Sequence, residues 1–281
     1  TFEFIKAFAQ RGRELGLEVL VEIHSYYKRQ MEIAQQVDWV YDFALPPLVL
    51  HALEFGRSGP LMNWIAQRPN NAVTVLDTHD GIGIIDIGAD AADRVNNPGL
   101  VPPEELDELV ERMHRNSQGQ SRQATGAAAS NLDLYQVNCT FFDALGRNAS
   151  AYLVARAIQF FVPGIPQVYY VGLLAGENDM DLLTRTKVGR DINRHYYSRE
   201  EVLADMNKPV VQRLIDLMRF RNSHLAFGGS FTSAAPAPHL LTLSWGHEAA
   251  YARLEVDLLA KSGRIIASAE DGGPEWVFEL K

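Results

Sequence analysis

A short β-branched run that ends abruptly in polar residues constrains the fold of this chain more than any other feature. Residues 72–76 read Ala-Val-Thr-Val-Leu and are followed at once by Asp77, Thr78, His79 and Asp80. Such a run is typical of a buried parallel strand whose last side chains emerge at the edge of a sheet. That edge is where α/β folds place the polar groups that contact ligands. The sequence therefore predicts a parallel sheet with a functional site at one edge.

A second apolar run ends in the same way. Residues 18–21 are followed by Glu22, Ile23 and His24, so two strand ends each present a carboxylate beside an imidazole. Because the carboxyl ends of parallel barrel strands meet on one side, we expect Glu22 and Asp80 to project into the same opening. The remaining sequence is interpreted as the scaffold that holds this pair.

Helices and strands alternate along most of the chain. Apolar residues at helical spacing predict helices over residues 1–15, 28–36, 46–54, 61–66, 103–114, 148–161 and 209–221. Short apolar runs predict parallel strands over residues 18–23, 37–43, 72–77 and 166–171. Four such β/α units are half of a (β/α)8 TIM barrel, which takes about 250 residues when complete. We therefore expect an α/β fold, the second half of such a barrel.

The regular alternation breaks twice, which predicts additional parts. The long stretch after Asp80 is interpreted as an inserted subdomain, because a long structureless loop inside a compact domain is improbable. Short alternating strands over 240–245, 249–258, 264–267 and 276–280 predict a small antiparallel β domain. The expected parts are barrel units in 1–80, the inserted subdomain and acceptor-site loop in 81–146, the last barrel unit in 147–226 and the antiparallel domain in 227–281. The chain opens at Thr1 inside a helical pattern, so we expect it to be the C-terminal portion of a longer protein.

The composition narrows the class of partner. A net charge of −9 argues against binding to nucleic acid or to an anionic membrane surface, and we expect neither as a partner. No run approaches the roughly 18 apolar residues that a membrane span needs. The single Cys139 excludes an internal disulfide and is expected to be a buried thiol, which fits a reducing, cytoplasmic location. A homodimer is an open alternative.

Two carboxylates across one opening suit the chemistry of the glycosidic bond. One carboxyl can protonate the leaving oxygen while another attacks or stabilises an oxocarbenium-like centre. In the competing interpretation, each carboxylate caps a helix or pairs with an arginine. Four tyrosines are suited either to stacking on sugar faces or to packing under loops: Tyr26, Tyr27, Tyr169 and Tyr170.

Other motifs do not complete a known pattern. Gly81-Ile82-Gly83 does not continue as G-x-G-x-x-G, because Asp86 stands in the place of the third glycine. Asp86, Asp90 and Asp93 are compatible with a calcium loop, but without EF-hand spacing a solvated acidic turn is the favoured interpretation. No H-E-x-x-H arrangement occurs, so we expect no metal and no cofactor. A non-catalytic carbohydrate-binding barrel is the alternative from another functional class.

Residues 19–27 and 75–83 resemble two signature regions of the α-amylase superfamily, glycoside hydrolase family 13. Further similar segments are 131–136, 163–172 and 189–194, and these favour its phosphorylase branch. The resemblance implies an enzyme that acts on sucrose and inorganic phosphate by retaining double displacement and yields fructose and α-glucose 1-phosphate. Phosphorolysis of sucrose 6'-phosphate or glucosylglycerate, and hydrolysis of sucrose, are the related alternatives.

The resemblance also implies roles for individual residues. Glu22 would be the general acid/base at the end of barrel strand 5, and Asp80 would be the transition-state stabiliser at the end of strand 7. The implied substrate-binding residues are His24 near the leaving group, His79 and Arg190 on the glucosyl unit, and the acceptor loop of Asp133, Leu134, Tyr135 and Gln136. The catalytic nucleophile of the family is an aspartate at the end of strand 4, and no residue of this chain can be assigned that role.

Overall fold

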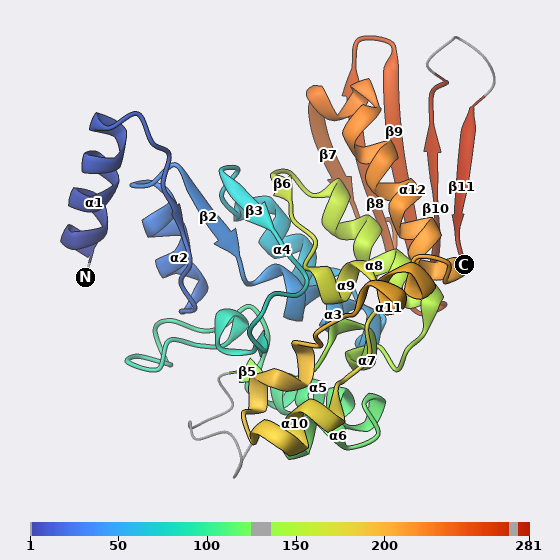
Figure 1. The fold of residues 1–281 in the computed structure, drawn as a ribbon. Coiled ribbons are helices and arrows are strands. Elements are labelled where there is room, and N and C mark those ends of the chain that lie inside the picture. The colour runs from blue at the N-terminus through green and yellow to red at the C-terminus, as the bar shows by residue number, and fades with distance from the viewer. Residues whose placement is uncertain (1, 125–135, 270–274) are drawn as a thin grey trace.

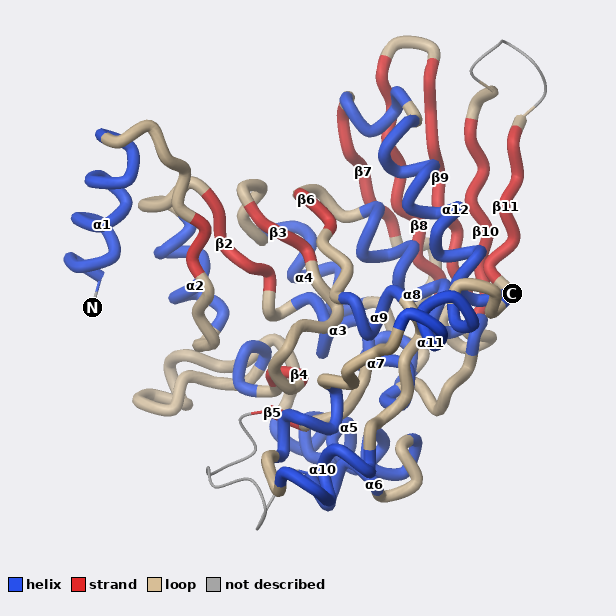
Figure 2. Tube along the Cα trace, viewed as in Figure 1, coloured by secondary structure: helices blue, strands red, loops and turns tan. Residues whose placement is uncertain are grey.

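A computed structural model describes residues 2–124, 136–269 and 275–281 of the chain (Figure 1). One end of the molecule is a small parallel sheet with its helices, and the other end is a larger antiparallel sheet. A group of short helices lies beside the parallel sheet, on the lower side in Figures 1 and 2. The expected α/β class followed by an antiparallel part is therefore seen directly. Within the described ranges, the structure has no helix that is both long and apolar enough to cross a membrane.

The parallel sheet contains the four predicted barrel strands. Its order is β1-β2-β3-β6, with β1 at Leu20–Val21, β2 at Trp39–Asp42, β3 at Ala72–Thr74 and β6 at Ile165–Pro166. The register pairs Leu20 with Trp39, Val40 with Ala72, and Val73 with Ile165 in the parallel sense. Every neighbouring pair is parallel, so the carboxyl end of each strand lies on the same side of the sheet. The polar residues that follow β1 and β3 are brought to one opening in this way.

The strand predicted over 166–171 is wrong beyond its first residue. The strand ends at Pro166, and Tyr170–Leu173 forms the short helix α9. The last bond from this segment to β3 is donated by the N–H of Gln167 to the carbonyl of Thr74, and the chain then leaves the sheet. Before the strand, Gly164 has a φ of +128°, and a Cβ there would collide with the carbonyl oxygen of Ala72. The close approach of β6 to β3 therefore requires a glycine.

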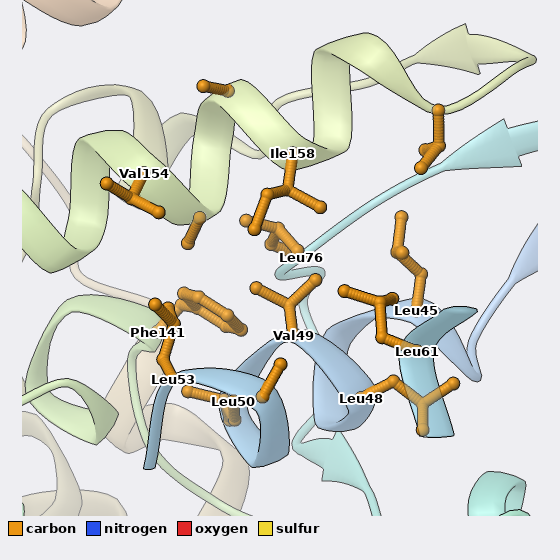
Figure 3. Packing of buried hydrophobic residues seen from close by; sticks show 14 of the residues in the cluster. Leu45, Leu48, Val49, Leu50, Leu53, Leu61, Leu76, Phe141, Val154 and Ile158 are labelled. Carbon is orange, nitrogen blue, oxygen red and sulfur yellow. The ribbon is translucent and has the colours of Figure 1, made fainter. Parts of the chain in front are cut away.

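Helices cover this sheet at the predicted positions. They are α1 at Phe2–Glu14, α2 at Tyr27–Ala34, α3 at Leu45–Phe55, α4 at Gly59–Gln67 and α8 at Ala149–Phe161. Figure 3 shows the main core, where Leu45 and Val49 of α3 point toward Ile158 of α8 and toward Leu76, just after β3. From Ala151 onward every residue of α8 is buried, so this helix is enclosed on all sides.

In its described part, the stretch after Asp80 holds six elements: β4 at Ile82–Gly83, η1 at Ile85–Ile87, α5 at Pro103–Asn116, α6 at Gln120–Ala124, β5 at Gln136–Val137 and α7 at Phe141–Ala144. Three of them pack against α3, namely β4, η1 and α5. The strands β4 and β5 pair antiparallel, with Ile82 opposite Val137. The amphipathic helix predicted over 103–114 is α5, which buries Leu109, Val110 and Met113. The proposed boundary of an inserted subdomain at 81–146 encloses all six elements and stays a prediction.

A second excursion separates α9 from the last long helix. It contains α10 at Met180–Thr186, the 3-10 helix η2 at Gly189–Asn193 and α11 at Arg199–Asp205. Asp179 caps α10 by accepting from the Leu182 N–H, and Ser198 and Glu201 form a capping box on α11. The 3-10 helix η2 therefore lies between two helices whose first turns are capped. It contacts the segment that follows β3.

The antiparallel sheet has five strands in the order β11-β10-β9-β8-β7. They are β7 at Ser230–Ala234, β8 at Leu240–His247, β9 at Ala250–Asp257, β10 at Ser262–Ala267 and β11 at Trp276–Leu280. The sequence predicted the last four and missed β7, whose Ser-Phe-Thr-Ser-Ala run has little apolar character and forms an edge. The long helix α12 at Pro209–Ser223, the 3-10 helix η3 at Leu225–Gly228 and α8 pack against this sheet. The indole of Trp245 donates to the carbonyl of Phe161 and ties β8 to α8.

Candidate active site

The structure brings Glu22, His24 and Asp80 together. Glu22 and His24 follow β1, and Asp80 follows β3, two strands away in the sheet. A carboxylate oxygen of Glu22, one of Asp80 and a ring nitrogen of His24 all lie within 4.8 Å of one another. Glu22 is exposed, whereas His24 and Asp80 are partly buried. Two carboxylates at this separation can act on the same bond of a small substrate.

Positive charge surrounds the carboxylate of Asp80. Its Oδ1 lies 3.0 Å from Nη1 of Arg190, 3.4 Å from Nη2 of Arg194 and 3.6 Å from Nε2 of His79. The Asp80 side chain is 11% exposed, while Arg190 and His79 are about half exposed. His79 and Arg190, which were predicted to bind the glucosyl unit, therefore lie at Asp80 with their outer surfaces facing solvent. Arg194 is a further neighbour that the sequence reasoning passed over within the same segment, 189–194.

The backbone around Asp80 is held by η2 and the residue after it. The side-chain amide of the buried Asn193 donates to the carbonyl of Asp80 at 2.8 Å and to that of Thr78 at 3.3 Å. Nε of Arg194 donates to the carbonyl of His79 at 2.7 Å. These bonds fix the loop that presents Asp80. The only sequence signal for Asn193 was its place beside Arg190, because an asparagine in a loop has no distinctive spacing.

Asp86 corrects the interpretation of the acidic turn. Its side chain is fully buried, with Oδ2 at 2.7 Å from Nδ1 of His24 and Oδ1 accepting from the Ser25 N–H and from Gln30. Burial raises the pKa of Asp86, while the hydrogen bond to His24 acts to lower it. The prediction that Asp86 joins a solvated turn is therefore wrong, because this carboxylate supports a site residue.

Asp90 and Asp93 match the favoured interpretation of an acidic turn near solvent. Asp90 binds Arg29 at 3.2 Å, and Asp93 accepts from the side chain and the N–H of Asn96. Backbone and side-chain N–H donors lower the pKa of both carboxyls. None of these bonds is to Glu22, His24 or Asp80. The two aspartates stabilise their own loop.

A buried ion pair lies beneath the strand end. Nη2 of Arg156 in α8 lies 2.7 Å from Oδ2 of Asp77 and also binds the hydroxyl of Tyr152 at 2.7 Å. The Tyr152 hydroxyl donates to the carbonyl of Gly172 at 2.5 Å. This network ties β3, α8 and α9 together. Sequence reasoning missed Arg156, since one arginine within an apolar helix does not reveal its partner.

Two of the four tyrosines serve the core. Tyr26 and Tyr27 are both buried, and their rings meet edge to face, with Tyr27 also against Trp64. The hydroxyl of Tyr26 donates to the carbonyl of Pro98. The rings of Tyr169 and Tyr170 lie 4.5 Å apart, and Tyr170 is 42% exposed. The packing interpretation therefore holds for Tyr26 and Tyr27, and sugar stacking stays a prediction for the other pair.

The predicted acceptor loop is described only at its last residue. Asp133, Leu134 and Tyr135 lie outside the described residues. Gln136 is buried in β5, where its backbone pairs with Gly83 of β4, close to the Asp86 and His24 pair. The role of Gln136 toward a substrate stays a prediction.

The thiol of Cys139 is buried, as predicted, and burial raises its pKa.

The possible ligand atoms of Glu22, His24 and Asp80 also lie close enough together to bind one cation. Among residues 2–124, 136–269 and 275–281 they form the one such group. Two guanidinium groups already lie against Asp80, however, and Nδ1 of His24 is bonded to Asp86. A cation at this point would be repelled by Arg190 and Arg194. The arrangement is better suited to a polar, hydroxyl-rich organic molecule.

Comparison with solved structures defines the class of fold. The sucrose 6F-phosphate phosphorylase from Thermoanaerobacter thermosaccharolyticum superposes with a TM-score of 0.85 and 36% identity, covering 99% of this chain and 55% of that one. An Anoxybacillus α-amylase gives a TM-score of 0.60 at 14% identity, covering 99% of this chain and 54% of that one. The chain thus folds as about half of a (β/α)8 barrel of the α-amylase type followed by an antiparallel sheet, as predicted.

Comparison with curated proteins identifies the family. A sucrose phosphorylase from Agrobacterium vitis is 59% identical over 268 residues, which are 95% of this chain and 54% of that protein. A sucrose phosphorylase from Bifidobacterium adolescentis is 56% identical over 254 residues, 90% of this chain and 50% of that protein. No protein-family model matches the chain. The chain belongs to the sucrose phosphorylase family and spans about half the length of the curated relatives it matches.

Proposed function

We propose that this chain supplies the general acid/base and the stabilising carboxylate of an enzyme that converts sucrose and phosphate into α-glucose 1-phosphate and fructose. The observation that supports it most directly is the convergence of Glu22, His24 and Asp80 within 4.8 Å at two strand ends. The identity of 59% to a sucrose phosphorylase supports the choice of substrates. The proposed reaction is a retaining double displacement, in which a glucosyl ester forms and is then broken.

Glu22 acts in this proposal as the acid and then as the base. Its exposed carboxyl protonates the fructosyl oxygen as the glycosidic bond breaks, and the resulting carboxylate later accepts a proton from the attacking phosphate. The nucleophile that carries the glucosyl group is not assigned to any residue of this chain. Glu22 therefore works together with a carboxylate that this chain does not supply.

Asp80 acts as the stabiliser of the glucosyl unit. As positive charge develops on the sugar ring, a carboxylate nearby lowers the energy of the transition state. Arg190 and His79 lie on the solvent side of Asp80, where they can contact sugar hydroxyls while keeping the carboxylate oriented. His24 lies beside Glu22 and is the proposed contact to the leaving group. The acceptor loop of Asp133, Leu134, Tyr135 and Gln136 is proposed to bind fructose and phosphate in turn.

The related phosphorylases define the competing substrates. A glucosylglycerol phosphorylase from Marinobacter adhaerens is 44% identical over 89% of this chain, a lower identity than that of the two sucrose phosphorylases. The test uses the complete product of the reading frame that contains this chain, here named the complete gene product. It is incubated with phosphate and, separately, sucrose, sucrose 6F-phosphate, glucosylglycerol and glucosylglycerate, and α-glucose 1-phosphate is measured. We expect sucrose to have the highest kcat/KM.

Two outcomes would contradict the proposal. A higher kcat/KM for another donor would assign the enzyme to that substrate. Binding of sucrose without any turnover would support the alternative of a non-catalytic carbohydrate-binding barrel.

We also propose a cytoplasmic location, supported by the single buried Cys139, and fractionation of the source cells tests it. A homodimer is tested by light scattering of the complete gene product.

A further inference from the structure

We propose that Asp86 is a positioning residue that holds His24 in one ring orientation and in the tautomer with hydrogen on Nδ1, and that it thereby sets which leaving and acceptor groups the site accepts. The first half of this inference concerns the geometry of the chain alone. The second half rests on the proposed function, because it assigns His24 to the leaving-group side of a glucosyl-transfer site.

The hydrogen bonds of Asp86 indicate which atom carries the hydrogen between Asp86 and His24. Oδ1 accepts from the Ser25 N–H at 3.0 Å and from Nε2 of Gln30 at 2.8 Å, so Oδ2 faces Nδ1 of His24 at 2.7 Å. Oδ1 receives two N–H donors, as expected of a carboxylate that only accepts hydrogen bonds, so Oδ2 accepts from Nδ1 and the hydrogen lies on the nitrogen. This is the arrangement by which a buried carboxylate fixes the tautomer of a functional histidine.

The ring of His24 is stacked on one face and has space at Gly83. The ring of Phe43, one residue after β2, stacks on His24 with centroids 3.8 Å apart and an interplanar angle of 14°. On the β4 side, a Cβ added to Gly83 would collide with Oδ2 of Asp86 and lie 3.0 Å from Nδ1 of His24. Gly83 therefore leaves the room in which the pair forms. Asp86 and Phe43 come from separate parts of the chain and hold the ring at its edge and on its face.

The tautomer has a consequence for recognition. When Nδ1 carries the hydrogen, Nε2 of a neutral ring accepts hydrogen bonds rather than donating them. A sugar hydroxyl can donate to such a nitrogen, whereas a phosphate oxygen can only accept from a donor. The pair therefore favours a hydroxyl-bearing group, such as the fructosyl unit of sucrose, over an anionic group at this edge of His24. This makes Asp86 a determinant of specificity that acts through His24.

The test replaces Asp86 by asparagine in the complete gene product. In Asp86→Asn, Oδ1 keeps its two donors and the new amide nitrogen takes the place of Oδ2, so it donates to Nδ1 and the ring hydrogen moves to Nε2. Nitrogen NMR with labelled histidine is expected to show hydrogen on Nδ1 of His24 in the wild type and on Nε2 in the variant. Asp90→Asn is the matched control, because it neutralises an aspartate of the same loop that binds Arg29.

Kinetics separate positioning from folding. In Asp86→Asn we expect kcat/KM for sucrose to fall about tenfold, the size of one lost hydrogen bond, while hydrolysis of α-glucosyl fluoride stays within about threefold, because fluoride needs no contact to His24. Equal losses with both donors would overturn the proposal. In a His24→Phe background, Asp86→Asn is expected to have no further effect on sucrose, and an additive loss would also overturn it.

The NMR measurement decides the tautomer of His24 even if Asp86→Asn does not fold or the enzyme assay shows no turnover. The wild-type spectrum alone is decisive when Asp86→Asn does not fold, since hydrogen on Nε2 of His24 in the wild type contradicts the inferred tautomer. If the complete gene product phosphorolyses none of the four donors, the proposed function is lost, whereas the NMR comparison still decides the positioning role.

Discussion

Nη1 of Arg190 lies 3.0 Å from Oδ1 of Asp80, although the inserted elements, α8 and α9 separate the two residues in the sequence. The contact joins the end of β3 to η2, and Asn193 and Arg194 hold the backbone on either side of Asp80. Substitution of Arg190 therefore tests whether η2 is part of the catalytic machinery.

Arg190→Met in the complete gene product is expected to lower kcat/KM for sucrose by about a hundredfold, because it removes the group that orients the Asp80 carboxylate and that is proposed to contact the glucosyl unit. Arg190→Lys should lose less, since it keeps the charge and loses only the planar fork. The measurement is initial-rate formation of α-glucose 1-phosphate. Arg199→Met, on the exposed surface of α11, is the control. Wild-type kinetics in Arg190→Met would remove this residue from the site.

Glu22→Gln tests the acid/base assignment. Fructose is a poor leaving group without protonation, so phosphorolysis of sucrose is expected to fall by several orders of magnitude. Fluoride leaves without that proton, so glucosyl transfer from α-glucosyl fluoride should be reduced far less. Both rates are measured with the same enzyme preparation. An equal loss for the two donors would assign Glu22 to binding or folding instead.

His195 gives the fold a pH dependence near η2. Nδ1 lies 2.6 Å from Asp179, the cap of α10, and Nε2 lies 3.3 Å from Glu201 in the capping box of α11. Burial acts to lower the pKa of His195, but the two carboxylates outweigh it and raise the pKa above its ordinary value of about 6.5. A raised pKa means that the stabilisation is complete below about pH 6.5 and is lost as the pH rises through the folded-state pKa.

His195→Gln is accordingly expected to lower Tm most at about pH 5.5 and to differ little from the wild type at about pH 8.5. Thermal unfolding at both pH values measures this. His247→Gln, at an exposed histidine of the antiparallel sheet, is the control substitution. A destabilisation of His195→Gln that grows toward high pH would contradict the assigned ion pairs.

Arg156→Met should destabilise the protein strongly, because it leaves Asp77 as a buried carboxylate without its guanidinium partner. Removal of one member of a buried ion pair costs about 3–5 kcal/mol of unfolding free energy. Denaturant titration measures the loss. Arg11→Met breaks an exposed pair with Glu14 on α1 and should change the stability little. Similar small effects for both variants would show that the buried network is not needed.

The 281-residue chain expressed alone is expected to self-associate. Among the described residues, β1 and β6 each pair on one side only, and apolar side chains near the β1 edge are exposed, such as Leu17 and Leu20. Unpaired parallel edges with apolar faces promote association. Leu20→Lys should reduce the apparent mass in light scattering, whereas Val95→Lys, in an exposed loop, should not. A monodisperse wild-type monomer would contradict this expectation.

Local patterns predicted much of the fold. Helical spacing located α3, α5, α8 and α12 to within a few residues. The buried side of each helix consists of apolar residues that recur at helical spacing within its own sequence. The strand predicted over 166–171 failed because the chain leaves the sheet after Gln167 and begins α9 at Tyr170. The edge strand β7 was missed because few of its residues are buried.

The sequence by itself determined the order of the β/α units and the presence of Glu22 and Asp80 at strand ends, since a strand and the polar residues that end it are neighbours in the chain. The resemblance of the same stretches supplied the family. Only the tertiary structure decided the partners of these groups: Arg190 with Asp80, Asp86 with His24 and Arg156 with Asp77. Each pair joins elements far apart in the sequence, and the burial that gives a charged group its partner arises only when those elements pack together.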